Sequence, residues 1–269
     1  MEKTDIKMTE LRHLQLAILT IMKDVDELCK RNNITYYLLG GSAIGAVRHE
    51  GFIPWDDDLD IMMSVDNYEK FINVCREQLD KEKYYLQVGL EDWPLNFTKV
   101  RLRGTEITEY EGYASHGENG IYLDIFKLEN SPSNKVAQWI QYVLAKYFLC
   151  YQLSVRTFNS GSLKKRLMMF ASFPLKLKLF REMVQRYVEH YGNDSDFYGS
   201  FYFRTRFKTA FTRKMVLGKP LYMQFEDTML PIPEHYDAYL TQIFGDYMTP
   251  PPIEKQVGLH MLKVDFGKY

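Results

Sequence analysis

The chain has 269 residues, of which 46% are apolar and 26% are charged, and its formal net charge is −1. Such a composition is typical of a globular protein with a sizeable core and excludes a largely disordered chain. The balanced charge also disfavours nucleic acid as a partner, because nucleic-acid-binding proteins carry an excess of basic residues.

The N-terminal 15 residues lack an apolar stretch between a basic start and a small-residue cleavage site, so we expect no signal peptide. No run reaches the ~18 apolar residues that span a bilayer. The three cysteines (Cys29, Cys75 and Cys150) are far apart and form no C-x-x-C pair. We expect buried reduced thiols, with a redox or metal role as the alternative, and therefore a cytoplasmic protein.

Apolar residues recur at three- and four-residue steps between Leu11 and Cys29, which predicts an amphipathic helix that ends near Asn32. Residues 34–39 form a short apolar and aromatic run without a helical stripe. We predict that this run is a buried strand that leads into the glycine pair at 40–41.

Gly41 and Ser42 precede a helix predicted over residues 43–48. Glycine lets a backbone come close to a phosphate, and the first N–H groups of a helix can donate to it. Ser42 is expected either to donate to a phosphate oxygen or to cap the helix, and the residues leave both roles open.

A run of acids follows at residues 56–60, and an apolar strand is predicted over residues 58–63. Asp58 and Asp60 alternate with apolar residues, so they share one strand face. Two close carboxylates resist joint ionisation unless a cation lies between them. We therefore predict that Asp58 and Asp60 bind a divalent metal, and that Asp56 and Asp57 cap or solvate the preceding turn.

Helical and strand patterns alternate in the next sixty residues. A helix is predicted over residues 65–79, with Tyr68, Phe71, Ile72 and Cys75 facing inward, and strands are predicted over residues 84–90, 97–103 and 120–128. This mixture, on a sheet that begins with a hairpin-like return, favours an α/β or α+β fold.

Asp124 is the lone carboxylate among the apolar residues of the strand predicted over 120–128. An uncompensated carboxylate inside a strand is costly, so a metal or a base should accompany it. A structural salt bridge is one explanation. Beside the Asp58 and Asp60 pair, we favour a third metal ligand or a general base.

Lys99, Arg101 and Arg103 alternate along the strand predicted over 97–103 and so share one face. Basic side chains there can hold a diphosphate, which we predict for Lys99 and Arg101 and less for Arg103. The alternative is an exposed edge strand that its charges protect from aggregation.

The second half of the chain is expected to be mostly helical. Residues 135–190 contain ten basic and two acidic residues. Within them, residues 163–180 interleave bases with large apolar groups, which fits either a surface helix on anionic lipid headgroups or a core helix with a solvated basic face. A proline-bounded amphipathic helix is predicted over residues 229–249. We place a catalytic core at residues 1–130 and a helical region that closes the site at residues 131–269.

The string GGSAIGAVRHEGFIPWDDDLDI at residues 40–61 resembles the LicD family, which includes bacterial phosphorylcholine transferases and fukutin-related sugar-phosphate transferases. The N-terminal helix and the tail at residues 233–252 are also similar to that family. The resemblance implies a nucleotidyltransferase-like mixed sheet flanked by helices. It also implies that Asp58, Asp60 and Asp124 are the metal-binding and catalytic acids. Glu50 stands where many relatives have a basic residue, so no phosphate contact is expected of it.

By this resemblance, the expected enzyme is a phosphorylcholine transferase that uses Mg²⁺, with Mn²⁺ as the alternative. It would move phosphocholine from CDP-choline or a similar CDP-alcohol to a sugar hydroxyl of a teichoic acid or lipopolysaccharide precursor, and release CMP. The acceptor is expected to be lipid-linked, at the inner face of the cytoplasmic membrane. The residues expected to contact substrate are Gly41, Ser42, Arg48, Trp55, Lys99, Arg101 and His260.

Three alternatives stay open. A true nucleotidyltransferase attacks the α-phosphorus and leaves a nucleotide on its product. A relative within the family transfers another CDP-linked alditol phosphate. A third alternative is an inactive scaffold, which the presence of all three acids disfavours.

Overall fold

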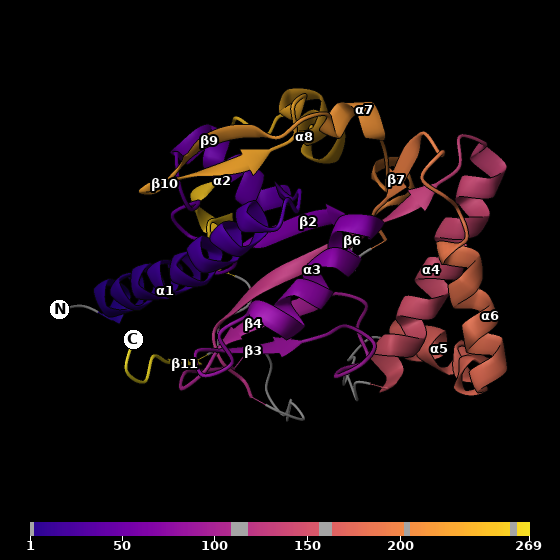
Figure 1. Cartoon of the computed structure of the whole chain (residues 1–269), viewed down its shortest axis with the longest axis horizontal. Coiled ribbons are helices and arrows are strands. Elements are labelled where there is room, and N and C mark those ends of the chain that lie inside the picture. Colours follow the sequence, from indigo (N-terminus) through magenta and orange to yellow (C-terminus); the bar gives the residue numbers. More distant parts are fainter. Residues whose placement is uncertain (1–2, 109–117, 156–162, 202–204, 259–262) are drawn as a thin grey trace.

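The computed structural model describes residues 3–108, 118–155, 163–201, 205–258 and 263–269 (Figure 1). Its helices are α1 (Lys3–Arg31), α2 (Gly40–His49), α3 (Val65–Gln78), α4 (Lys135–Val155), α5 (Leu163–Ala171), α6 (Lys178–Glu189), α7 (Lys214–Leu217) and α8 (Tyr236–Phe244), with short 3₁₀ turns η1 (Phe173–Lys176), η2 (Phe207–Thr209) and η3 (Ile253–Lys255). Its strands are β1 (Tyr37–Leu38), β2 (Asp60–Ser64), β3 (Tyr84–Gln87), β4 (Thr98–Leu102), β5 (Glu106–Thr108), β6 (Tyr122–Ser131), β7 (Phe197–Gly199), β8 (Phe211–Arg213), β9 (Leu221–Phe225), β10 (Thr228–Ile232) and β11 (Lys263–Asp265). The fold is α+β, as predicted.

The central sheet has the strand order β1-β2-β6-β4-β3, and β7 extends it along the far end of β6. Strands β2 and β6 run parallel, whereas the other pairs in the sheet are antiparallel. The antiparallel pairing of β1 with β2 is the hairpin-like return that the sequence indicates. Strand β6 is the longest strand of this sheet and lies at its centre, so it positions groups from both neighbours.

The two faces of the sheet differ in chemistry because side chains alternate along each strand. One face carries apolar residues and packs under α1 and α3 (Figure 1). On this face the Tyr68 hydroxyl of α3 meets the Thr98 hydroxyl of β4 at 2.6 Å, and the Tyr84 hydroxyl of β3 donates to Asp24 of α1. The opposite face carries the polar residues of β2, β6 and β4.

The helices of the first half agree with the sequence periodicity. Helix α1 ends at Arg31, and α3 buries Tyr68, Phe71, Ile72 and Cys75, as predicted. All three cysteines are unbridged; Cys29 and Cys75 are buried, as predicted, whereas Cys150 is only partly buried. The amphipathic patterns therefore suffice to predict which side of these two helices is buried, because each helix packs one face on the sheet.

Several element boundaries differ from the predictions. The strand predicted over residues 34–39 is reduced to β1, and α2 begins at Gly40 rather than at residue 43. The helix predicted over residues 229–249 is wrong in its first part, because residues 228–232 pair with β9 as strand β10. The edge-strand alternative for β4 is also wrong, since β4 lies between β6 and β3 and its five residues are buried.

The largest hydrophobic core joins residues from both predicted parts of the chain. It contains residues from α1 and the sheet together with Leu217, Phe225, Leu230 and Tyr239 from the second half. Two smaller clusters lie among residues 144–211, where α4 and α6 pack. The division at residue 130 stays a prediction. Among the helices of the described residues, none is both long and apolar enough to cross a membrane.

Candidate active site

A row of polar side chains crosses four strands of the sheet. Asp60 of β2 lies in register with Asp124 of β6, Asp124 with Lys99 of β4, and Lys99 with Gln87 of β3. Side chains of residues in register point to the same face. The sheet topology therefore brings together two acids that are 64 positions apart. Strands β2 and β6 are parallel neighbours in the sheet, although β3 and β4 lie between them in the sequence.

Lys99 and Asp124 form a buried ion pair at the centre of this row. The Lys99 Nζ lies 2.8 Å from Oδ1 and 3.1 Å from Oδ2 of Asp124, and Lys99 is 1% exposed. The same ammonium lies 3.1 Å from the ring centroid of Tyr122 and within 5.5 Å of those of Trp93 and Phe97. The aromatic rings and the carboxylate together stabilise a lysine that burial alone would disfavour.

Further acids converge on the start of β2. Carboxylate oxygens of Asp56, Asp57 and Asp58 all lie within 4.8 Å of one another. Burial raises the pKa of the Asp60 carboxyl well above its usual range, and the charges of Asp58, Asp124 and Asp56 raise it further. The Lys99 ammonium acts in the opposite direction. Acidic side chains thus outnumber the one lysine beside them.

The donor chemistry of this cluster fits a divalent cation. Carboxylate oxygens are hard ligands of the kind that Mg²⁺ and Mn²⁺ take. Mutual repulsion of buried carboxylates is relieved when a cation lies among them. The oxygens within reach of a single ion are those of Asp56, Asp57 and Asp58, and Asp56 also acts on Asp60 through its charge. The set Asp58, Asp60 and Asp124 stays the predicted one.

Asp57 is 3% exposed, so the prediction that it solvates the turn is wrong, whereas the alternative that it caps the turn stays a prediction. A Cβ added to Gly258 would stand 2.9 Å from its Oδ2, so the C-terminal segment packs directly on this carboxylate. The sequence gives a run of three acids without saying which of them faces inward. Asp57 thus lies within the acidic cluster, whereas the sequence predicted a role for it only in the turn.

The first turn of α2 lies against the acids. A Cβ at Gly41 would be 3.0 Å from the Asp56 Oδ2, so a larger residue there would crowd the carboxylate. The capping role considered for Ser42 is wrong, because α2 begins at Gly40 and its N-terminus has no side-chain cap. Instead, the Ser42 Oγ accepts the backbone N–H of Asp60 at 2.9 Å and joins α2 to the start of β2.

Arg48 and Trp55, the predicted substrate-binding residues that follow this turn, lie at and beyond the end of α2. Arg48 donates from Nη1 to the backbone oxygen of Tyr247 at 2.5 Å and from Nε to His49 at 2.9 Å. The indole of Trp55 lies edge-on to the His49 ring, with centroids 6.1 Å apart. Arg48 therefore ties the end of α2 to the segment that follows α8.

Arg101 lies further along β4, and Arg103 follows the end of that strand. Arg101 is buried and donates to Gln87 Oε1 at 2.8 Å and to the backbone oxygen of Gly120 at 3.0 Å. Arg103 donates to the backbone oxygen of Tyr84 and pairs with Glu118. Lys99 and Arg101 are thus on the same face as the acids, and their predicted contact with a diphosphate stays a prediction. The predicted His260 lies outside the described residues.

Helix α8 closes the other side of the row. The Tyr239 hydroxyl contacts the Met62 sulfur at 3.5 Å, and burial raises the pKa of this phenol. Its environment includes the Gly40 backbone and the Asp60 charge. Sequence reasoning missed Tyr239 and Gln87, because a tyrosine on a helix and a glutamine at a strand end give no signal of their own.

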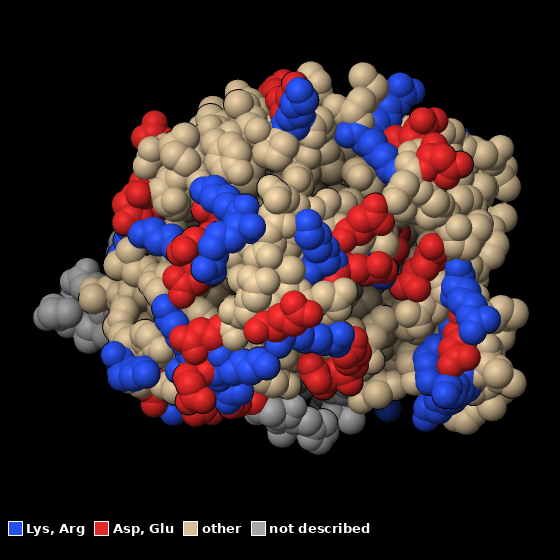
Figure 2. Space-filling model, viewed as in Figure 1, with Lys and Arg blue, Asp and Glu red and all other residues tan. Residues whose placement is uncertain are grey.

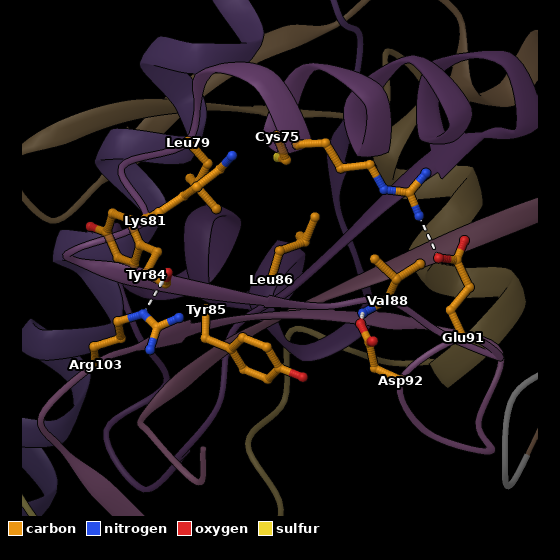
Figure 3. Close-up of a pocket in the computed structure, with 11 residues that line it drawn as sticks. Cys75, Leu79, Lys81, Tyr84, Tyr85, Leu86, Val88, Glu91, Asp92 and Arg103 are labelled. Carbon is orange, nitrogen blue, oxygen red and sulfur yellow. Dashed lines mark hydrogen bonds and ion pairs between the residues drawn. The ribbon is translucent and has the colours of Figure 1, made fainter. Parts of the chain in front are cut away.

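A hollow of about 450 Å³ lies elsewhere, at the outer edge of β3 beside α3 (Figure 3). Its polar groups pair with one another: Arg76 with Glu91, and Asp92 with the backbone N–H of Val88. None of the predicted metal-binding acids lines it. We therefore place the chemistry at the acidic row.

The sequence matches the family described as LicD/FKTN/FKRP, nucleotidyltransferase domain, over residues 33–235. It is 28% identical over 268 residues to the lipopolysaccharide cholinephosphotransferase LicD of Haemophilus influenzae, which covers 95% of this chain and 98% of that protein. An uncharacterized protein of Rickettsia prowazekii is 38% identical over 81 residues, 23% of this chain and 30% of its own length. Another from Rickettsia typhi is 54% identical over 46 residues, 17% of this chain and 15% of its own.

Proposed function

Because the chain belongs to the LicD/FKTN/FKRP nucleotidyltransferase-domain family, we propose that it transfers phosphocholine from CDP-choline to a sugar hydroxyl of a cell-surface glycan precursor. The similarity to a lipopolysaccharide cholinephosphotransferase along nearly the whole chain supports this activity. The proposal includes a divalent metal, Mg²⁺ or Mn²⁺, and an acceptor that is lipid-linked at the inner face of the cytoplasmic membrane.

The observation that carries the proposal is the polar row on the sheet. Asp60, Asp124 and Lys99 are adjacent across three strands, and Asp58 adds its charge at the start of β2. Three carboxylates beside a glycine-lined helix N-terminus fit a substrate that carries phosphates together with a cation. A purely structural salt bridge would need only one carboxylate for Lys99.

The residues of this chain have separate tasks in the proposed reaction. A bound Mg²⁺ would neutralise the charge of the diphosphate. Asp58, Asp60 and Asp124 would hold it, and Lys99 fixes the orientation of Asp124 through both carboxylate oxygens. The acceptor hydroxyl oxygen forms the new bond to the phosphorus that bears choline, the bond from that phosphorus to the CMP oxygen breaks, and CMP leaves with the electron pair. A carboxylate of the cluster takes the hydroxyl proton.

Positioning supplies most of the rate in such a reaction, since phosphoryl transfer needs little covalent assistance. Gly258 packs on the buried Asp57 carboxylate. This contact would help to exclude water from that acid.

A second candidate changes the donor and keeps the chemistry. The Tyr122, Trp93 and Phe97 rings beside Asp124 already surround the Lys99 ammonium, so they do not form a cage for choline. A donor whose alditol group carries no cation, such as a CDP-linked alditol phosphate, would need no such cage. A true nucleotidyltransferase, which attacks the α-phosphorus, remains the third candidate.

The experiment is a donor panel. Purified protein is incubated with Mg²⁺, an acceptor glycan and CDP-choline, CDP-ribitol or CDP-glycerol, and CMP release is measured together with the product mass. The expected result is that only CDP-choline, among the three donors, gives CMP release, and that the product is heavier by one phosphocholine. A product heavier by a nucleotide monophosphate, or turnover of another donor only, would overturn it. Protein carrying Asp60→Asn serves as the inactive control.

A further inference from the structure

The apolar-basic face is the outer side of α5, η1 and α6, and its large apolar side chains are exposed. Six of them are between 57% and 82% exposed: Leu163, Leu167, Phe170, Phe173, Leu179 and Met183. Monomeric proteins rarely leave so many large apolar groups uncovered in one short segment. Such exposure marks a surface that binds something apolar.

Helix geometry explains why these residues lie outside. Leu163, Leu167 and Phe170 follow steps of four and three, so they share one side of α5, and Leu179 and Met183 share one side of α6. The inner side of α6 presents Val184 instead, in a cluster with Leu175 and Phe148 of α4. Since all three elements pack on α4, their outer sides have no further layer of the described protein over them.

Basic residues accompany the apolar ones. Residues 163–189 contain seven Lys or Arg and two Glu. Figure 2 shows Lys and Arg side chains at the lower right of the view, over α5 and α6, with acidic side chains between them and uncharged ones around them. A face that is both apolar and positively charged is complementary to an anionic bilayer surface, where acyl chains lie under phosphate headgroups.

A hollow of about 590 Å³ lies between the end of α4, α5 and η1, and it shares Phe170 and Phe173 with the apolar-basic face. Phe170, Phe173 and Lys176 line it together with Tyr151. The Lys176 Nζ lies 4.9 Å from the centroid of the Phe173 ring. An ammonium beside aromatic rings at the mouth of a hollow can hold a lipid phosphate, with the rings at the level of the headgroups.

We propose that the apolar-basic face docks the protein on the surface of a membrane that contains anionic lipids. Helix α5 has nine residues and α6 has twelve, so each is too short to span a bilayer and would lie in its surface. The docking does not rest on the proposed function, because vesicle binding requires no turnover. Protein that binds vesicles without releasing CMP keeps this proposal and loses the other.

The test is co-sedimentation of the full chain with vesicles of phosphatidylcholine alone and of phosphatidylcholine with 30% phosphatidylglycerol. We expect binding to the anionic vesicles, weakened by salt. Lys176→Glu with Lys178→Glu should reduce the binding constant at least about tenfold, since each basic residue near an anionic surface contributes ~1 kcal/mol. The control is Lys208→Glu with Lys263→Glu, which changes two lysines that are exposed elsewhere and should leave the binding constant unchanged.

The apolar half is tested by Phe170→Ser with Phe173→Ser, which should also reduce binding at least about tenfold. The matched control is Met215→Ser with Ile253→Ser, two residues that are exposed elsewhere. Circular dichroism checks that each variant is folded. Equal losses in the control variants, or no preference for anionic over neutral vesicles, would overturn the proposal.

A measurement on the unmodified protein covers the case in which a variant does not fold. Backbone amide exchange with and without anionic vesicles should show protection within residues 163–189. Protection only elsewhere, or tight binding to a 20-nucleotide RNA without binding to vesicles, would contradict the proposal.

Discussion

The sheet region and the helical region of α4 to α6 distribute charge in opposite ways. In the sheet, Lys99, Asp124 and Arg101 are buried and bonded to one another or to the backbone, and the apolar face is covered by α1 and α3. In the helical region, large apolar residues such as Leu179 are exposed beside exposed bases. Buried charge and exposed apolar surface are both costly, so each indicates a role beyond folding.

The comparison also separates two kinds of stability. The sheet region shares one extensive core, whereas the helical region relies on two small clusters. Substitutions of the acids in the sheet site should therefore change activity strongly, and substitutions that break its ion pairs should lower the free energy of unfolding. Substitutions on the outer side of α5 and α6 should change neither.

The largest effect is expected at the acids of the row. Asp58→Asn or Asp60→Asn should reduce turnover by at least about 10³-fold, because metal-assisted charge stabilisation supplies several kcal/mol and each 1.36 kcal/mol is a factor of ten. The free energy of unfolding should stay the same or rise, since one of several repelling carboxylates is removed. Steady-state CMP release and urea denaturation measure the two quantities. Asp227→Asn, an exposed acid, is the control, and turnover retained at the wild-type rate by Asp60→Asn would contradict the assignment.

The next effect concerns the buried ion pair. Lys99→Met leaves the Asp124 carboxylate without its lysine in a dry environment and should reduce the free energy of unfolding by ~3–5 kcal/mol. The double variant Lys99→Met with Asp124→Asn should recover a large part of this loss. Thermal and urea denaturation of the two variants measure it. Equal stability of the single and double variants would show that the pair is not coupled.

A matched pair of leucines compares the inner and outer sides of the helical region. Leu175 is 0% exposed and Leu179 is 82% exposed, although they are four residues apart. Leu175→Ala should reduce the free energy of unfolding by ~2–5 kcal/mol, and Leu179→Ala by less than ~0.5 kcal/mol. Urea denaturation measures both, and a large loss for Leu179→Ala would mean that this side is packed in the protein.

The smallest effect is a pH dependence of the free energy of unfolding. At the junction of the two regions, Lys127 pairs with Glu129, also on β6, and with Glu189 on α6. Burial raises the pKa of Glu129 from 4.5 to about 7, which the Lys127 charge partly opposes. The folded state therefore keeps a proton that the unfolded state releases, so stability falls as the pH rises from about 4.5 to about 7. The wild type should lose ~1–3 kcal/mol more than Glu129→Gln over this range. Parallel pH-stability curves for the two proteins would refute the raised pKa.

Local patterns in the sequence predicted several elements well. The periodicity predicted the end of α1, the extent of α3 and the inward residues of α3, because an amphipathic helix needs only its own spacing to show which face is buried. It missed the first residues of α1, which begins at Lys3 rather than near Leu11. Alternation along β2 and β4 likewise placed Asp60 and Lys99 on defined strand faces. The lone carboxylate of a strand that is otherwise apolar pointed to Asp124 as the third acid, and the family resemblance agreed with that choice.

The pairing of strands was not readable from the sequence. Asp60 lies beside Asp124 because β2 and β6 pair in parallel in this register. Asp124 lies beside Lys99 because β4 pairs with the other edge of β6. The hairpin of β9 and β10 was missed for the same reason, since a short proline-bearing strand acquires its state from its partner.

The sequence by itself determined which residue types alternate and at what period, and hence the α+β class, the acids and the basic helical segment. Only the tertiary structure decided that Asp57 is buried, that Lys99 pairs with Asp124, and that the apolar residues of α5 and α6 stay exposed. The physical reason is range: periodicity is a property of neighbours in the chain, whereas burial and pairing depend on segments that are distant in sequence and meet only in the folded protein.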